Sequence, residues 1–324
     1  MAWIRTKRLA ALLLLLLALL PASPAGADSG IVSGTTVSGT VRVYLSSIAS
    51  NTSVDLTIDG SYSIGGDTSR AIARGTKATV KNSGGTLTLT LNGQTQTMGS
   101  RFKLRRHQTS GENGVRIAQA RYPGSLYPGD IEFIAKGGNV QVIVHVFMED
   151  YMLGVLPYEM DNSFPLEALK AQAVAARSYL AWKMPAFGGG GCSQGVDTDV
   201  CTDSTHCMAY WSEEEMRERW GEAYAENRAR IEEAVRATAG EGMLYNGSPI
   251  QALFHSASGG QTEDAQAVWG TAYPYLTSVE SAEEGESGEE VRLKIGALVS
   301  ALNEAFPGAN LTEQNVRSAF SVRS

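Results

Sequence analysis

The stretch PLEALKAQAVAARSYLAW, residues 165–182, decides much of the fold, because its apolar side chains recur at helical spacing. One stripe of this helix carries Leu166, Leu169, Ala173, Ala176 and Leu180. Pro165 suits the first helical turn, where its missing N–H costs no hydrogen bond. Since alanines let another element approach closely, we predict a buried alanine-rich helix over 165–182.

A second long helix is predicted over 212–238. Ser212 and Glu215 form a capping box at its start, and Gly240 stands beyond its end. Gly221 is expected to interrupt it, because glycine is a poor helix former. The segments predicted to follow are strands over 243–245 and 250–254, an acidic linker over 283–290 and a helix over 293–306.

Residues 32–146 have the pattern of successive β-strands. Apolar and polar side chains alternate over 41–45, 53–58 and 86–91, and turn sequences separate these runs. The segments 129–134 and 140–146 predict a hairpin. The sequence therefore predicts an α+β fold, with a β-rich N-terminal region over 28–125. A mixed core over 126–324 is expected to pack the two helices on antiparallel strands.

The first 27 residues are typical of a secretory signal. Three basic residues precede an unbroken apolar run over 9–20, and Ala25-Gly26-Ala27 suits a signal peptidase. We expect cleavage after residue 27 and a secreted or cell-envelope protein. The apolar run is shorter than the roughly 20 residues of a spanning helix. An uncleaved signal that anchors the protein to the membrane stays an alternative.

The composition bears on the class of partner. The 324-residue chain carries a net charge of -7, whereas a nucleic-acid binder usually shows a strongly basic face. We therefore expect no nucleic-acid partner. The 12 tyrosines and 5 tryptophans suit a glycan-binding surface, although aromatic side chains are more often part of a core.

Glu159 lies in the segment LPYEM, residues 156–160, between the hairpin and the alanine-rich helix. Apolar neighbours can raise the pKa of a carboxyl by desolvation, so that it donates a proton near neutral pH. On this segment alone, a carboxylate in a surface loop is the simpler interpretation.

The segment FHSASGGQT, residues 254–262, is a glycine-rich turn after a predicted strand. Such a turn lets the backbone approach a ligand closely, while His255 and the serine hydroxyls make hydrogen bonds. A serine hydrolase is disfavoured, because Ser258 and His255 share one turn and no G-x-S-x-G elbow is present.

Three cysteines lie close together in the sequence, and two of them flank a histidine. Cys201, His206 and Cys207 are plausible zinc ligands, and Cys192 could be the fourth, since structural zinc normally takes four. Outside the cytoplasm, a disulfide between two of the cysteines is an equal alternative. The sequence leaves both open.

Several motifs together resemble one family, the stage II sporulation protein D (SpoIID) and amidase-enhancer (LytB) family. The motifs that carry the resemblance are PYEM at 157–160, the alanine-rich helix to Tyr179, DST at 203–205, the segment 255–262, VWG at 268–270 and PYL at 274–276. They occur in the family's order and make 126–324 a SpoIID-type catalytic domain. Members of the family commonly continue past the region matching 317–320, so a truncated or divergent member is expected.

The resemblance implies a lytic transglycosylase that cuts peptidoglycan glycan strands whose stem peptides have been removed. Glu159 falls on the family's catalytic glutamate and would act first as acid and then as base, while the sugar's own 6-hydroxyl closes a 1,6-anhydro ring. A second carboxylate, which ordinary glycoside hydrolysis uses, is not needed. No cofactor is required for catalysis, and zinc at the cysteine loop would be structural. The expected substrate-binding residues are Gln172, Arg177, Tyr179, His255, Ser256 and Ser258.

The same resemblance leaves a second function open. The chain could be a non-catalytic wall-binding protein that enhances an N-acetylmuramoyl-L-alanine amidase. The expected partners are peptidoglycan glycan strands, and an amidase and other sporulation proteins are further candidates. A purely structural secreted protein would have no affinity for glycan.

Overall fold

The structure is a computed structural model that describes residues 31–109, 113–122, 124–258, 260–281 and 292–320. It divides the chain into two compact units, residues 1–254 and residues 255–324, and each is described by itself. The predicted boundary between residues 125 and 126 lies inside the first unit. The predicted signal over 1–27 and the acidic linker over 283–290 lie outside the described residues.

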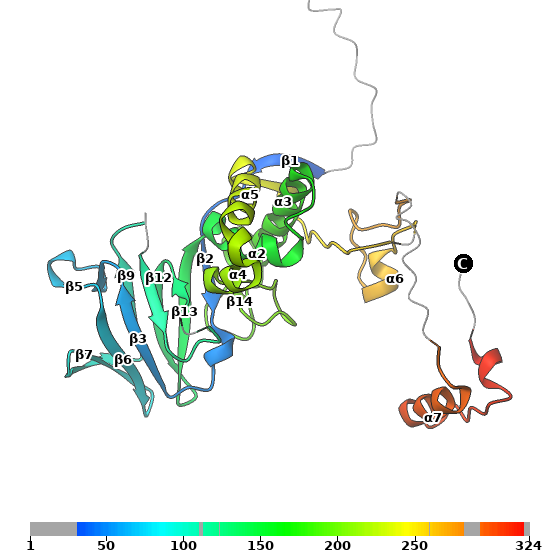
Figure 1. The fold of residues 1–324 in the computed structure, drawn as a ribbon, viewed down its shortest axis with the longest axis horizontal. Coiled ribbons are helices and arrows are strands. Elements are labelled where there is room, and N and C mark those ends of the chain that lie inside the picture. The colour runs from blue at the N-terminus through cyan, green and yellow to red at the C-terminus, as the bar shows by residue number, and fades with distance from the viewer. Residues whose placement is uncertain (1–30, 110–112, 123, 259, 282–291, 321–324) are drawn as a thin grey trace, which may run out of the picture. The chain divides into compact units, whose positions relative to one another are not determined.

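The strand-rich part of the first unit consists of two sheets that pack face to face (Figure 1). The six-stranded sheet has the order β11 (Leu126–Tyr127), β10 (Gly114–Ile117), β3 (Ser53–Asp59), β6 (Thr76–Ser83), β7 (Thr86–Leu91) and β8 (Gln94–Gly99). The seven-stranded sheet has the order β14 (Val200–Cys201), β2 (Thr40–Tyr44), β13 (Asn139–Phe147), β12 (Asp130–Lys136), β9 (Arg101–Arg106), β4 (Tyr62–Ile64) and β5 (Ala71–Ile72). Alternation explains the packing: in β3, Val54, Leu56 and Ile58 are buried between the sheets.

Among the described residues, the α-helices of the first unit follow β13. They are α2 (Met148–Glu159), α3 (Leu166–Lys183), α4 (Glu213–Trp220) and α5 (Tyr224–Ala237). Helix α3 packs against α2, α5 and β15 (Glu241–Tyr245), which pairs with β1 (Ile31–Thr36) and β16 (Ser248–Pro249). The predicted stripe on α3 is fully buried at Leu169, Ala173, Ala176 and Leu180. The predicted α+β fold with a strand-rich N-terminal part is therefore confirmed.

Two local predictions need correction. Residues 250–254 do not form a strand, because the hairpin partner of β15 ends at Pro249. Glu159 does not lie in a surface loop, because α2 continues through Pro157 and ends at Glu159. Burial of the residues before Pro157 outweighs the hydrogen bond that proline removes from the helix. The predicted break of the second helix at Gly221 is confirmed, and this glycine has a positive φ of 52°.

In its described residues, the second unit has the α-helices α6 (Ala265–Trp269) and α7 (Ile295–Ala305) and a 3-10 turn at Val316–Ala319. Helix α6 starts at Asp264, whose side chain accepts a hydrogen bond from the backbone N–H of Gln266. Helix α7 lies within the predicted helix over 293–306. Among the residues described, no helix is both long and apolar enough to cross a membrane.

A buried ion pair joins the helices of the first unit to β15. Arg177 of α3 is fully buried and binds both carboxylate oxygens of Glu149 on α2, at 3.0 and 2.7 Å. Its guanidinium also donates to the backbone oxygens of Val235 and Glu241, at the end of α5 and the start of β15. Glu149 in turn accepts a hydrogen bond from the backbone N–H of Gly240. One side-chain pair therefore holds four elements together.

Arg177→Met should lower the free energy of unfolding by about 3 kcal/mol, because it leaves Glu149 as an unpaired charge. We expect the low end of the range for buried pairs, since the Glu149 side chain keeps 29% exposure and its bond to Gly240. Urea unfolding followed by tryptophan fluorescence measures the change. Arg236→Met is the matched control: Arg236 pairs with Glu232 on the surface, and its loss should cost less than about 0.5 kcal/mol. Equal effects of the two variants would contradict the structural role of Arg177.

Candidate functional site

Glu159 is a half-buried carboxyl at the C-terminal end of α2. Burial raises the pKa of this carboxyl, and a hydrogen bond from the backbone N–H of Ala209 opposes the rise. The unpaired carbonyls at the end of the helix act in the same direction as burial, because they repel a carboxylate. The surroundings therefore favour a protonated Glu159 while they provide one donor for its ionised form.

The Ala209 amide reaches Glu159 because residues 209–211 lie directly against α2. The backbone N–H of Trp211 donates to the carbonyl of Gly154 at 3.0 Å. A Cβ atom at Gly154 would stand 2.6 Å from the backbone oxygen of Trp211, so no larger residue fits without displacing the segment. Gly154 is thus the position on α2 that permits the close approach.

Aromatic contacts hold the same segment in place. Tyr151 of α2 stacks on Tyr210, with ring centroids 5.4 Å apart. Tyr158 meets the edge of Trp211 at 5.7 Å, and its side chain remains 46% exposed. An accessible aromatic ring therefore stands next to Glu159 in the sequence and borders the same segment.

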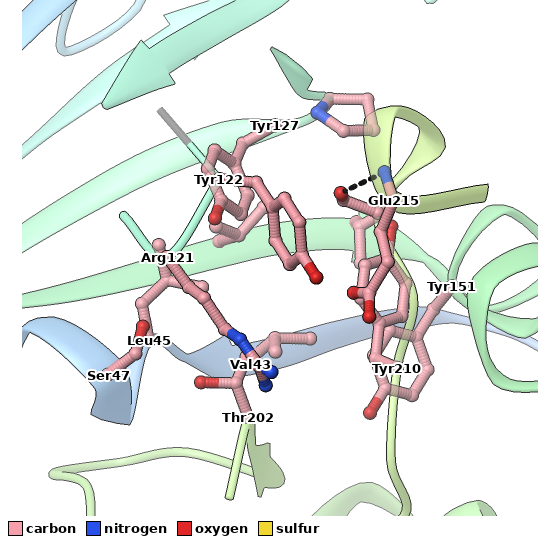
Figure 2. A pocket seen from close by; sticks show the side chains of 14 residues that line it. Val43, Leu45, Ser47, Arg121, Tyr122, Tyr127, Tyr151, Thr202, Tyr210 and Glu215 are labelled. Carbon is pink, nitrogen blue, oxygen red and sulfur yellow. Dashed lines mark hydrogen bonds between the residues drawn. The ribbon is translucent and has the colours of Figure 1, made fainter. Parts of the chain in front are cut away.

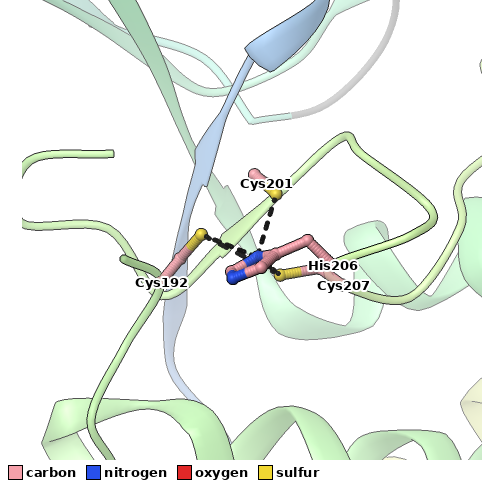
Figure 3. Close-up of side chains that lie close together, drawn as sticks. All are labelled: Cys192, Cys201, His206 and Cys207. Atoms are coloured by element: carbon pink, nitrogen blue, oxygen red, sulfur yellow. Dashed lines mark hydrogen bonds between the residues drawn. The ribbon is translucent and has the colours of Figure 1, made fainter. Parts of the chain in front are cut away.

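Four potential metal ligands converge beside this segment (Figure 3). They are the three sequence-predicted ligands Cys201, His206 and Cys207, together with Cys192. The thiol sulfurs lie 3.5, 3.4 and 3.5 Å from Nδ1 of His206, for Cys201, Cys207 and Cys192 respectively. The three cysteines are free and buried. From the sequence, Cys192 was only a possible fourth ligand. The structure places it in the cluster.

The cluster has the dimensions of a tetrahedral zinc site. Zinc bonds of about 2.3 Å to sulfur and about 2.0 Å to nitrogen place ligand atoms about 3.5–3.8 Å apart. The measured spacings to His206 agree, and Sγ of Cys192 and Cys207 are 4.0 Å apart. Nε2 of His206 contacts the Ser193 hydroxyl at 3.2 Å, the kind of outer partner that orients a ligating histidine. Lys183 lies 3.3 Å from Sγ of Cys207 and balances negative thiolate charge.

One predicted sugar-binding residue lines an open cavity next to the cluster. Tyr179 borders a cavity with an empty volume of about 560 Å³, together with Thr205, His206 and Phe254. Met208 also lines it, and the next residue, Ala209, bonds to Glu159. The cavity and the carboxyl therefore share one short backbone segment.

The other predicted sugar-binding residues are placed differently. Arg177 is fully buried in its ion pair, so the predicted role in sugar binding does not fit its position, and it is a structural residue. Gln172 is 8% exposed, and its Nε2 atom has no hydrogen-bond partner among the described residues. His255 and Ser256 are exposed and Ser258 is half-buried, and all three belong to the second unit.

Sequence reasoning missed two contributors to the surroundings of Glu159. Gly154 gives a signal only once the helix α2 is known, because a glycine inside a helix can mark a close approach of backbone. Ala209 gives no comparable signal, since it contributes only its backbone N–H.

The fold and the site define an α+β protein with one half-buried glutamate beside a three-cysteine, one-histidine cluster. Residues 136–245 match the model of the stage II sporulation protein (SpoIID) family. Glu159, Tyr179 and all four cluster residues lie within that match, whereas His255, Ser256 and Ser258 follow it. This stretch is thus similar to the SpoIID family, as the motifs indicated.

Relatives with the same names support this assignment. The chain is 38% identical over 141 residues to stage II sporulation protein D of Bacillus subtilis strain 168. The aligned stretch covers 44% of this chain and 40% of that protein. It is 39% identical over 139 residues to stage II sporulation protein D of Bacillus amyloliquefaciens, covering 43% and 40%. It is 35% identical over 135 residues to the amidase enhancer of Bacillus subtilis strain 168, covering 42% and 16%. The matches span 40% or less of the length of these three relatives.

Proposed function

We propose that the protein is a lytic transglycosylase that cleaves peptidoglycan glycan strands after N-acetylmuramic acid. The half-buried carboxyl of Glu159, whose pKa is raised, is the observation that carries this proposal. The SpoIID-type domain and the similarity to an amidase enhancer support a role in sporulation or cell-wall remodelling. Export to the cell envelope, guided by the segment over 1–27, belongs to the same proposal.

Glu159 supplies the proton chemistry in two steps. The protonated carboxyl first donates its proton to the glycosidic oxygen, and the bond from that oxygen to the anomeric carbon of N-acetylmuramic acid breaks. The resulting carboxylate then removes the proton from the 6-hydroxyl of the same sugar. The 6-oxygen bonds to the anomeric carbon and closes the 1,6-anhydro ring, so Glu159 ends protonated again.

The surroundings of Glu159 suit both steps. Burial raises the pKa of the carboxyl and so favours the protonated form that a general acid needs at the start. The Ala209 N–H stabilises the carboxylate that exists between the two steps. The nucleophile is part of the substrate, so a second carboxylate to activate water is unnecessary.

We also propose that Cys192, Cys201, His206 and Cys207 hold a structural zinc ion. The spacings of the four ligand atoms favour this over a disulfide, which would join only two of the residues. The ion would fix the backbone from residue 201 to residue 207, two residues before the amide that contacts Glu159. Its contribution would be to the position of this segment.

The alternative function is enhancement of an amidase without catalysis. The similarity to the amidase enhancer favours it, and exposed Tyr158 offers a ring on which a bound glycan could stack. Such a protein would bind glycan strands, and its effect on an amidase would not depend on the proton of Glu159.

Glu159→Gln should abolish the formation of 1,6-anhydro ends on peptide-free glycan strands, because the amide neither donates nor accepts the required proton. Wild-type activity should fall as the pH rises through the raised pKa of Glu159, since the acid is then ionised. Mass spectrometry of the products measures both effects.

The matched control for this experiment is Glu222→Gln, at an exposed glutamate in the 3-10 turn Gly221–Ala223. It should retain wild-type activity. Products without anhydro ends from the wild-type protein, despite glycan binding, would contradict the transglycosylase and favour the enhancer.

The zinc proposal predicts one zinc ion per chain by elemental analysis and three thiols that react only after chelation. Cys207→Ser should lower the zinc content and the melting temperature, because it removes one ligand. Ser193→Ala, which alters only the outer contact of His206, should retain the metal. A protein purified without reductant that contains a disulfide and no zinc would disprove the metal site.

A further inference from the structure

A second cavity lies in the first unit, and Glu159 is not among its lining residues (Figure 2). Its enclosed space is about 150 Å³, and a wider region of about 810 Å³ continues into open solvent, so a bound ligand would bury one face and leave the other exposed. The floor is apolar and consists of Val43, Leu45, Val144 and Val146, which belong to or directly follow β2 and β13. A ligand with an apolar face could therefore rest on the sheet.

Aromatic rings surround this floor. Four tyrosines line the cavity: Tyr122, Tyr127, Tyr151 and Tyr210. Hydroxyl groups of Ser47 and Thr202 stand at another part of the lining. Rings that cover an apolar ligand face, together with hydroxyls that can bond to its polar edge, suit a sugar ring better than a purely apolar ligand.

The two charged side chains that line the cavity, Glu215 and Arg121, differ in whether they have a bonding partner. Glu215 is 6% exposed, and its carboxylate is bound by Arg219 at 3.0 Å and by the hydroxyl of Tyr122. Arg121 has no hydrogen bond or ion pair within the described part of the chain, and its guanidinium lies 5.6 Å from the centroid of the Tyr122 ring. Figure 2 shows the Arg121 side chain extending toward Thr202.

Among the described residues that line the cavity, the charge without a partner is therefore positive, although the protein as a whole carries a net charge of -7. An arginine can bind a carboxylate through two parallel hydrogen bonds, as it also can a phosphate. An acidic ligand in this cavity would meet an available cation, since the one acidic side chain in the lining is already bonded.

We propose that this cavity is a second saccharide site, which binds a sugar ring bearing one carboxylate, such as N-acetylmuramic acid. The ring would rest on the valine floor between the tyrosines, and the carboxylate would pair with Arg121. The choice of N-acetylmuramic acid, and with it of a carboxylate, rests on the proposed action on peptidoglycan, whereas the preference for an anionic ring rests on the cavity alone.

The site is separate from Glu159 but close to it along the chain. Tyr210 lines the cavity, while the backbone of its neighbour Ala209 contacts Glu159. A sugar acid bound here would hold the glycan near the catalytic carboxyl without taking part in the proton transfers. Binding should consequently survive the loss of Glu159.

Calorimetric titration of the whole exported chain tests the proposal with three compounds: N-acetylmuramic acid, N-acetylglucosamine and benzoate. N-acetylmuramic acid should bind at least about tenfold more tightly than either other compound, since only it offers both the carboxylate and the sugar hydroxyls. Glu159→Gln should bind it as the wild type does. Equal binding of the neutral sugar, or tighter binding of benzoate, would overturn the assignment of an acidic sugar.

Arg121→Gln should weaken binding of N-acetylmuramic acid about tenfold and leave N-acetylglucosamine unaffected, because only the carboxylate loses its partner. Tyr122→Leu should weaken both sugars. Arg236→Gln, at an exposed arginine on α5, is the matched control and should change neither. Unchanged binding in Arg121→Gln, or loss of binding in Glu159→Gln alone, would place the sugar elsewhere and overturn the proposal.

These results are separable from the proposed catalysis. If N-acetylmuramic acid binds as expected while no anhydro products form, the transglycosylase fails and the acidic-sugar site stands. If anhydro products form while N-acetylmuramic acid does not bind, or binds equally well to Arg121→Gln, only the proposal of the second site is overturned.

Discussion

The buried ion pair between Arg177 and Glu149 is the constraint on which the helical part of the first unit depends. The two residues are 28 positions apart, and their side chains and backbone partners connect α2, α3, α5 and β15. A buried pair of this kind contributes little net stability compared with apolar side chains of the same volume, since desolvation offsets the attraction. Its effect here is geometric: it fixes the start of α2, the helix that ends at Glu159.

The raised pKa of Glu159 depends on contacts at the C-terminal end of the same helix. Gly154 allows residues 209–211 to lie on α2, and this contact both covers the carboxyl and supplies the Ala209 amide. The last residue of the cluster, Cys207, stands two positions before Ala209 in the same stretch of chain. A carboxyl whose pKa is raised by burial makes the folded state less stable once it ionises, so this arrangement favours protonation at the expense of stability at high pH.

Much of the architecture follows from local patterns, and the site follows from them only in part. The stripe on α3 and the break at Gly221 were predictable, because helical periodicity and glycine act over a few residues. The continuation of α2 through Pro157 was not, since burial against other elements outweighs proline's local preference. The role of Arg177 was missed for a related reason: its partner Glu149 is distant in sequence. The spacing of Cys201, His206 and Cys207 suggested metal ligands, but only the fold brings Cys192 to them.

Burial at the end of α2 gives the carboxyl of Glu159 a higher pKa than that of an exposed glutamate. A carbon-13 NMR titration of the glutamate carboxyls, with Glu159 assigned by its absence in Glu159→Gln, measures this directly. We predict that the Glu159 signal titrates at a higher pH than those of exposed glutamates such as Glu222. Titration together with the exposed glutamates, or below them, would contradict the account.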